Sequence, residues 1–114
     1  MTNHITIRRA TGTWVVRAGG AVLGESKAAL ELTEGDYPPV IYFPQADLAM
    51  AFLEKTDYET RCPHKGTASH YAIVTKSKTL QDAAWCYEAP INEVVQIKDH
   101  VAFYPSEDLA VEQL

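Results

Sequence analysis

The sequence has 114 residues and a mass of 12.6 kDa, which favours one domain with a single core. Ten basic and fifteen acidic residues give a net charge of −5, so the overall positive charge typical of nucleic-acid-binding or anionic-lipid-binding proteins is absent. The chain is 46% apolar and 22% charged, no apolar run reaches the roughly 18 residues of a membrane span, and the N-terminus shows no signal-peptide pattern. We therefore expect one domain over residues 1–114, in the cytoplasm, with no nucleic-acid or membrane partner.

The first part of the chain predicts a series of β-strands. Residues 14–17 and 21–24 are apolar runs joined by a Gly-Gly turn, a pattern typical of a β-hairpin. Residues 30–33 alternate apolar with polar side chains, and residues 40–43 are again rich in β-forming types. These segments predict successive strands.

Residues 45–54 predict the principal helix of the chain. Pro44 suits a first helical turn, because a proline lacks the N–H that would be unpaired there. Asp47 would lie in that turn, where the helix dipole stabilises a carboxylate. The apolar positions of the segment fall on one stripe at helical spacing: Leu48, Phe52 and Leu53.

The second half of the chain predicts further strands. Residues 68–75, 83–88 and 101–104 have strand composition, whereas residues 56–60 read as a polar connection and residues 93–97 as a short strand or one helical turn. The sequence therefore predicts a mainly β or α+β fold, a small antiparallel β domain with one principal helix.

Four short blocks resemble a known family. The blocks are Tyr42-Phe43-Pro44-x-x-Asp47, Cys62-Pro63-x-Lys65-Gly66-x-Ala68, Ala84-Trp85-x-Tyr87-x-x-Pro90 and Ala102-Phe103-Tyr104. Together they resemble the bacterial domain-of-unknown-function family four-two-seven, which is labelled nucleotidyltransferase-like and has no demonstrated activity. The resemblance spans about residues 14–105, and it implies a small, mostly β fold similar to the tent-shaped β domains of the Mss4-like kind.

Two features depart from that resemblance. The family pattern would place a tyrosine at position 70, where this chain has His70 followed by Tyr71. Tent-shaped relatives commonly hold zinc with paired Cys-x-x-Cys motifs, whereas Cys62 and Cys86 belong to no such pair. We therefore expect reduced thiols, and the sequence implies no cofactor.

The sequence lacks the motifs that nucleotidyl transfer requires, despite the label of the family. Such enzymes bring carboxylates together on divalent metal ions beside a glycine-rich phosphate loop. The nearest spacings, Glu34-x-Asp36 and Asp57-x-Glu59, fall in segments expected to be turns or connections. Nucleotidyl transfer is therefore not expected.

Cys62 is a candidate catalytic nucleophile. It lies among Arg61, His64 and Lys65, and positive neighbours favour the reactive thiolate. Free cysteines more often behave as small buried hydrophobes, and this structural interpretation is favoured.

A metal site is an alternative interpretation of the same region. Zinc accepts both thiolate and imidazole ligands, and one possible ligand set is Cys62, His64, His70 and Cys86. The spacing of these residues gives the alternative little support.

A ligand-binding pocket is the principal functional hypothesis. Lys65 followed by Gly66 can offer an ammonium and closely approaching backbone N–H groups to an anion. Aromatic residues of three expected strands could form an apolar wall around it. The candidate ligand-binding residues are Tyr42, Lys65, Gly66, Trp85, Tyr87 and Tyr104.

Two classes of function therefore remain open. The first is binding of a small molecule or an anionic ligand, with or without an enzymatic step. The alternative is a non-catalytic homodimeric or protein-interaction module, because tyrosine and tryptophan are also favoured at the centres of interfaces.

Overall fold

The structure, a computed structural model, describes residues 4–114 and contains ten strands and three short 3₁₀ turns. The strands are β1 (Ile5–Arg9), β2 (Trp14–Ala18), β3 (Ala21–Ser26), β4 (Leu30–Glu34), β5 (Val40–Pro44), β6 (Leu53–Cys62), β7 (Gly66–Val74), β8 (Thr79–Cys86), β9 (His100–Phe103) and β10 (Leu109–Gln113). The 3₁₀ turns are η1 (Gln45–Asp47), η2 (Met50–Phe52) and η3 (Asn92–Ile97). The prediction of a mainly antiparallel β fold is confirmed.

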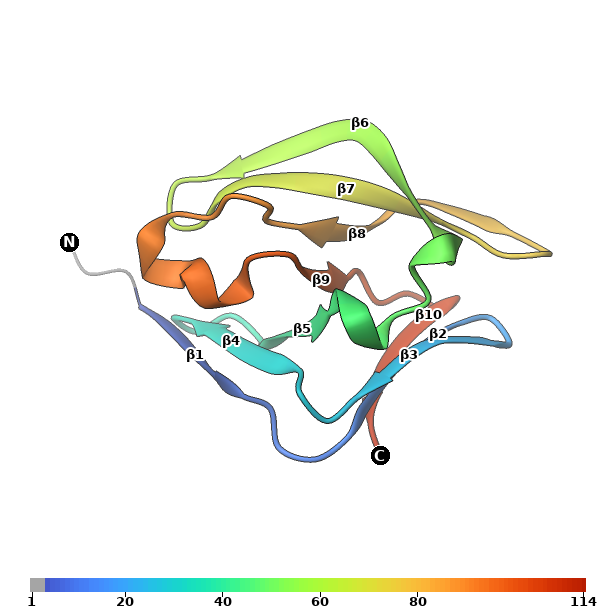
Figure 1. Cartoon of the computed structure of the whole chain (residues 1–114), viewed down its shortest axis with the longest axis horizontal. Coiled ribbons are helices and arrows are strands. Elements are labelled where there is room, and N and C mark those ends of the chain that lie inside the picture. Colours follow the sequence, from blue (N-terminus) through green and yellow to red (C-terminus); the bar gives the residue numbers. More distant parts are fainter. Residues whose placement is uncertain (1–3) are drawn as a thin grey trace.

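The strands form two sheets (Figure 1). The larger sheet has seven strands in the order β1-β4-β5-β9-β8-β7-β6, and the smaller has three in the order β10-β2-β3. Every pairing between these strands is antiparallel. In Figure 1 the larger sheet runs from β6 at the top to β1 at the lower left, and η3 lies in orange at the left, beside the middle strands.

Alternating side chains of the larger sheet supply two apolar clusters, one on each face. One cluster packs against the smaller sheet and contains Phe43, Cys86 and Phe103 together with Val16 and Leu109. The other contains the neighbours of those residues in the chain, Tyr42, Tyr87 and Ala102, and is covered by η3 through Val94 and Ile97. The larger sheet is therefore buried on both faces over its middle strands, and the candidate site lies on the η3 face.

The prediction of a helix over residues 45–54 is wrong. Pro44 ends β5 in an extended conformation, and only the turns η1 and η2 follow, separated by an extended Leu48. Leu48 forms a bridge with Gly24 of β3, and the Ala49 N–H donates to the Leu23 carbonyl at 2.7 Å. These pairings with β3 take the backbone groups that a continuous helix would use.

Side-chain contacts reinforce the break. The Ser26 hydroxyl donates to the Asp47 carboxylate at 2.7 Å, so Asp47 is fixed to β3 and does not serve a helix dipole. Gly24 permits the close approach, because a Cβ there would lie 2.6 Å from the Asp47 carbonyl oxygen. Tertiary contacts thus override a segment of good helix formers.

The sequence-based strands 14–17, 21–24, 30–33 and 40–43 correspond to β2 through β5, and the three predicted in the second half correspond to β7, β8 and β9. Three strands were not predicted: β1, β10 and β6. The sequence predicts a helix end and a polar connection over β6, because β6 is the outermost strand of its sheet and most of its side chains are exposed. Over residues 4–114, no helix has the length and apolar character needed to cross a membrane.

Strands β5 and β9 separate soon after they meet. Only two residue pairs join them, Phe43 with Val101 and Pro44 with His100. Residues 40–42 of β5 pair with β4 alone, while β9 continues beside β8 as far as Phe103. The sheet therefore has a fork between β5 and β9, which opens beside the candidate site.

Candidate ligand-binding site

Five of the six predicted ligand-binding residues line one pocket of about 180 Å³. Tyr42 comes from β5, Lys65 from the turn between β6 and β7, Trp85 from β8, and Tyr87 and Tyr104 from just after β8 and β9. The other lining residues are Leu32, Glu34, Tyr37, Pro38, Val40 and Thr60. Residues from β4 and from β6, which are far apart in the order of the larger sheet, thus meet at this pocket.

Gly66 is the predicted residue that does not line the pocket. Its φ of +115° allows the tight turn after Lys65, and a Cβ there would lie 3.4 Å from the Ala89 carbonyl oxygen. Gly66 lines a separate depression beside Cys62. Its structural role is therefore to shape the turn that presents Lys65.

Lys65 is paired with Glu34, which is the last residue of β4 and which the sequence places in a turn. The Lys65 ammonium lies 2.6 Å from Glu34 Oε1, and the two side chains are only 12% and 25% exposed. Strands β5, β9 and β8 lie between β4 and β7 in the sheet, so a flat sheet would hold the two segments about 19 Å apart. The contact shows that the sheet curls around the pocket.

Lys65 retains binding capacity despite this pair. An ammonium carries three N–H donors, and one of them meets Glu34. The Lys65 backbone is also fixed, because its carbonyl accepts from the Ile91 N–H at 3.0 Å. The pocket thus has one immobilised cation whose charge is balanced by a neighbouring carboxylate.

Trp85 lies at the centre of the aromatic wall. Its Nε1–H donates to the Tyr42 hydroxyl at 3.3 Å, and the two rings meet edge to face with centroids 6.2 Å apart. The ring of Tyr104 also packs against Trp85, with centroids 4.3 Å apart. Three aromatic side chains thereby fix one another's positions.

The pocket tyrosines remain neutral at physiological pH. Burial is the main cause that raises the pKa of Tyr42 and of Tyr87, and nearby Glu34 adds a smaller upward contribution to both. Burial likewise raises the pKa of Tyr104. The three hydroxyls therefore keep their protons. The Tyr42 hydroxyl accepts from Trp85, so its own O–H can still donate a hydrogen bond to a ligand.

His70 is a buried residue that contacts the Tyr104 hydroxyl. The His70 ring is fully buried, and its Nε2 is hydrogen-bonded to the Tyr104 hydroxyl at 3.2 Å. The Tyr58 ring packs edge-on against it with centroids 4.7 Å apart. Its Nδ1 is the buried side-chain nitrogen that lacks a hydrogen-bond partner within residues 4–114.

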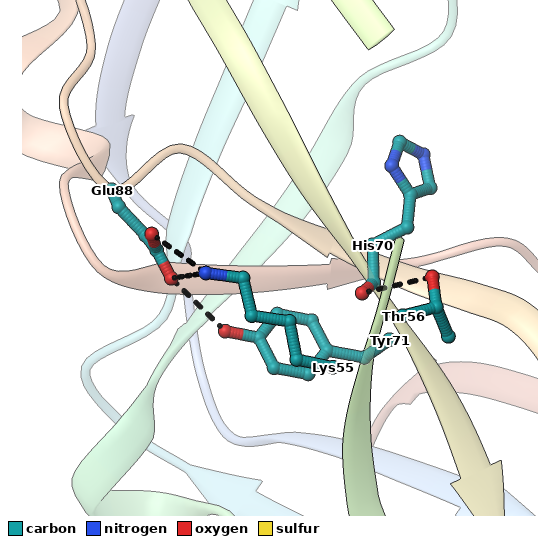
Figure 2. Close-up of polar contacts among 5 residues, drawn as sticks. All are labelled: Lys55, Thr56, His70, Tyr71 and Glu88. Carbon is teal, nitrogen blue, oxygen red and sulfur yellow. Dashed lines mark hydrogen bonds and ion pairs between the residues drawn. The ribbon is translucent and has the colours of Figure 1, made fainter. Parts of the chain in front are cut away.

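Strand alternation separates His70 from its neighbour Tyr71. Figure 2 shows the His70 ring pointing away from Tyr71, whose hydroxyl donates to Glu88 at 3.3 Å. The Glu88 carboxylate is also paired with Lys55 at 3.1 Å. The tyrosine at position 71 therefore belongs to the opposite face of the sheet, and His70 occupies the position that the family pattern gives to a tyrosine.

The alternative metal site is not assembled. Residues 4–114 contain no group of three or more His, Cys, Asp and Glu side chains placed to hold a metal ion. His64 is exposed in its turn, whereas Cys86 lies on the face opposite Trp85 and His70, because Trp85 pairs with His70 and adjacent residues alternate. Burial is the main cause that raises the pKa of the Cys86 thiol to about 12, so this sulfur stays protonated.

Cys62 lies outside the aromatic pocket. It is half-buried at the end of β6 and lines the depression that also contains Gly66, Arg61 and Glu59. Its use as a nucleophile stays a prediction.

Glu34, Tyr37 and Thr60 are pocket residues that sequence reasoning missed. Glu34 is 31 positions from Lys65, and no local pattern relates the two. Tyr37 had a possible signal, because it precedes Pro38-Pro39 in an exposed segment where a large aromatic side chain is not needed for a core.

The fold and the pocket define a small antiparallel β protein with an aromatic-lined hollow beneath a curled sheet. Comparison with protein families matches residues 6–113 to the family described as Domain of unknown function (DUF427), and the chain belongs to this family. Comparison with curated proteins gave no match.

Proposed function

We propose that the protein binds a small organic molecule in the pocket formed by Tyr42, Lys65, Trp85, Tyr87 and Tyr104. The observation that carries the proposal is that one immobilised lysine and three neutral tyrosines line a single hollow together with Trp85. An apolar wall with a few convergent polar groups is the usual form of a small-molecule site.

The ligand is a compact molecule with a planar apolar part and an oxygen-bearing acidic group. The planar part packs against Trp85, and the acidic group accepts from Lys65 and a tyrosine hydroxyl. Because Glu34 already balances the charge of Lys65, we favour a singly charged carboxylate over a phosphate of higher charge. Any enzymatic step would act on this bound molecule.

A thermal-shift screen tests the proposal. The purified protein is heated with nucleotides, sugar phosphates, benzoate and other small carboxylic acids, and divalent metal salts. A ligand at a hundred times its dissociation constant stabilises a fold by about 2.7 kcal/mol, which gives a shift of several degrees. Benzoate or another carboxylic acid should give a saturable shift.

The matched variants separate binding from folding. Lys65→Met keeps the apolar stem and removes the ammonium, and it should abolish the shift. Lys78→Met removes a lysine that pairs with Asp108 outside the pocket and should retain the shift. A folded wild-type protein that responds to no member of the panel, or an equal response in Lys65→Met, contradicts the proposal.

A second candidate function is self-association or protein interaction through the edge of the larger sheet. Strand β6 is the last strand in the sheet order and pairs with β7 alone. Its exposed charges, Glu54, Lys55, Glu59 and Arg61, and the irregularity between Lys55 and Glu59 are features that usually protect an edge from pairing. We therefore rank this function below ligand binding, and light scattering at several protein concentrations tests it.

A further inference from the structure

A larger groove lies beside the aromatic pocket, where β5 separates from β9. Its volume of about 740 Å³ is within the usual range of small-molecule sites, about 300 to 1,000 Å³. We define this fork groove by four aromatic and two acidic residues of its lining: Trp14, Tyr37, Trp85, Phe103, Glu31 and Glu34. It shares Trp85, Tyr37 and Glu34 with the aromatic pocket.

The aromatic residues come from distant parts of the fold. Trp14 belongs to the smaller sheet, Trp85 and Phe103 to the middle of the larger sheet, and Tyr37 to the connection between β4 and β5. The Tyr37 side chain is largely exposed at 73%, and its backbone N–H donates to the Glu34 carbonyl at 3.0 Å. The turn therefore fixes the backbone of Tyr37 beside the groove, and the ring remains open to a ligand.

The charged residues of the groove are all acidic. Glu31 accepts from Arg8 at 2.7 Å and Glu34 from Lys65 at 2.6 Å, in each case through Oε1. Within residues 4–114 the Oε2 atom of either carboxylate makes no hydrogen bond. Arg8 is 71% exposed, so solvent screens its charge, whereas Lys65 is 12% exposed and balances the charge of Glu34. No lysine or arginine lines the groove itself, so Glu31 is its less compensated carboxylate.

We propose that the fork groove binds a small organic cation with an alkylated ammonium head. Aromatic faces attract such a cation through their negative π-surfaces, and the methyl groups on its nitrogen can pack against the apolar lining. The carboxylate of Glu31, whose partner Arg8 is screened by solvent, adds an attraction for positive charge. A hard metal cation or a strongly hydrated primary amine would lose hydration that these walls do not replace. This inference does not depend on the proposed function of the aromatic pocket.

The protein carries its own probe for this site. Its only two tryptophans, Trp14 and Trp85, both line the fork groove. Titration with choline should therefore change the intrinsic tryptophan fluorescence in a saturable way. The uncharged isostere 3,3-dimethylbutan-1-ol has the same shape as choline without the charge. It should bind at least about tenfold more weakly than choline.

Two variants test the assigned groups. Tyr37→Ala removes an exposed aromatic face and Glu31→Gln removes a charge, and each should weaken choline binding about five- to tenfold. Glu59→Gln is the matched control for the charge, because Glu59 is an exposed carboxylate of β6 that lies outside the groove, and it should leave the affinity unchanged. Far-ultraviolet circular dichroism verifies that each variant is folded.

Three results would overturn the inference: no saturable fluorescence change with choline, equal affinity for the uncharged isostere, or equal affinity in Tyr37→Ala and Glu31→Gln. A peptide containing trimethyllysine serves as a further arm. Tighter binding of that peptide than of choline would assign the same head group to a modified protein and overturn a free small molecule as its source. Because Glu31 lines the fork groove and not the aromatic pocket, the outcome for Glu31→Gln is independent of the carboxylate screen.

Discussion

The Lys65 ammonium and the Glu34 carboxylate meet across three intervening strands at 2.6 Å, which makes this pair a brace between the two sides of the curled sheet. If either residue loses its charge, the other remains as a half-buried charge without its ion-pair partner. We expect Lys65→Met and Glu34→Gln each to lower the free energy of unfolding by about 1 to 3 kcal/mol.

A double-mutant cycle measured by urea unfolding checks this brace. The double variant should lose less than the two single losses together, with a coupling of about 0.5 to 3 kcal/mol. The Lys78–Asp108 pair is the control, because its side chains are 52% and 37% exposed and its coupling should stay below about 1 kcal/mol. Equal coupling in the two pairs would mean that Lys65 and Glu34 do not brace the sheet.

Gly24 provides a second test, of the contact that breaks the expected helix. In Gly24→Ala the new Cβ would lie 2.6 Å from both the Asp47 carbonyl oxygen and Leu48 Cδ2, so the chain must shift. We expect a loss of about 1 to 3 kcal/mol. Gly20→Ala, in the same hairpin, meets no atom within 4 Å and should change stability by less than about 0.5 kcal/mol. Similar unfolding midpoints for the two variants in urea would contradict the packing argument.

These contacts also explain how far the sequence predicts the fold. Strands β2 through β5 were predictable because their alternation and turn residues are local signals. The helix prediction over residues 45–54 failed because the Leu48–Gly24 bridge and the Ser26–Asp47 hydrogen bond join segments more than twenty residues apart.

The candidate site was predictable to a similar extent. Aromatic residues and a lysine beside a glycine stand out in the sequence, and five of the six predicted residues line one pocket. The partner Glu34 and the fork between β5 and β9 arise from the curl of the sheet, and strand periodicity alone does not specify that curl.

His70 and Tyr104 give a third test, of a buried nitrogen. His70→Phe loses the bond to Tyr104 but also removes Nδ1, which has no partner in the described part of the chain. We expect a change within about 1 kcal/mol. Tyr104→Phe keeps the histidine and takes away its hydrogen-bond partner, so it should cost about 1 to 3 kcal/mol. Urea unfolding of both variants checks the order, and a larger loss in His70→Phe would contradict it.

Stability at alkaline pH provides a fourth test. Burial is the main cause that raises the pKa of Tyr71 from 10.0 to about 12 and of the Cys86 thiol from 9.0 to about 12. The unfolded chain therefore releases these protons at lower pH than the folded chain, so stability is full below pH 9 and falls between about pH 9 and 12.

Unfolding midpoints in urea, measured from pH 8 to pH 11, check this expectation. The decline should be shallower between pH 9 and 11 in Cys86→Ala, although that variant starts from a lower stability because a buried side chain is shortened. Val101→Ala is the control, because it shortens a buried side chain that carries no titratable group, and its decline should match that of the wild type. A flat profile from pH 8 to 11 in the wild type would show that the buried groups do not titrate differently on unfolding.

The pairing of β10 with β2 has a consequence for how the protein forms in the cell. Leu109 pairs with Ala18 and Gln113 with Trp14, so the smaller sheet joins the beginning of the described chain to its far end. Residues 109–113 must therefore have left the ribosome before Val111 can pair with Val16 and complete that wall of the fork groove. Until then the apolar residues of β2 lack one neighbouring strand, and such transiently exposed strands favour aggregation.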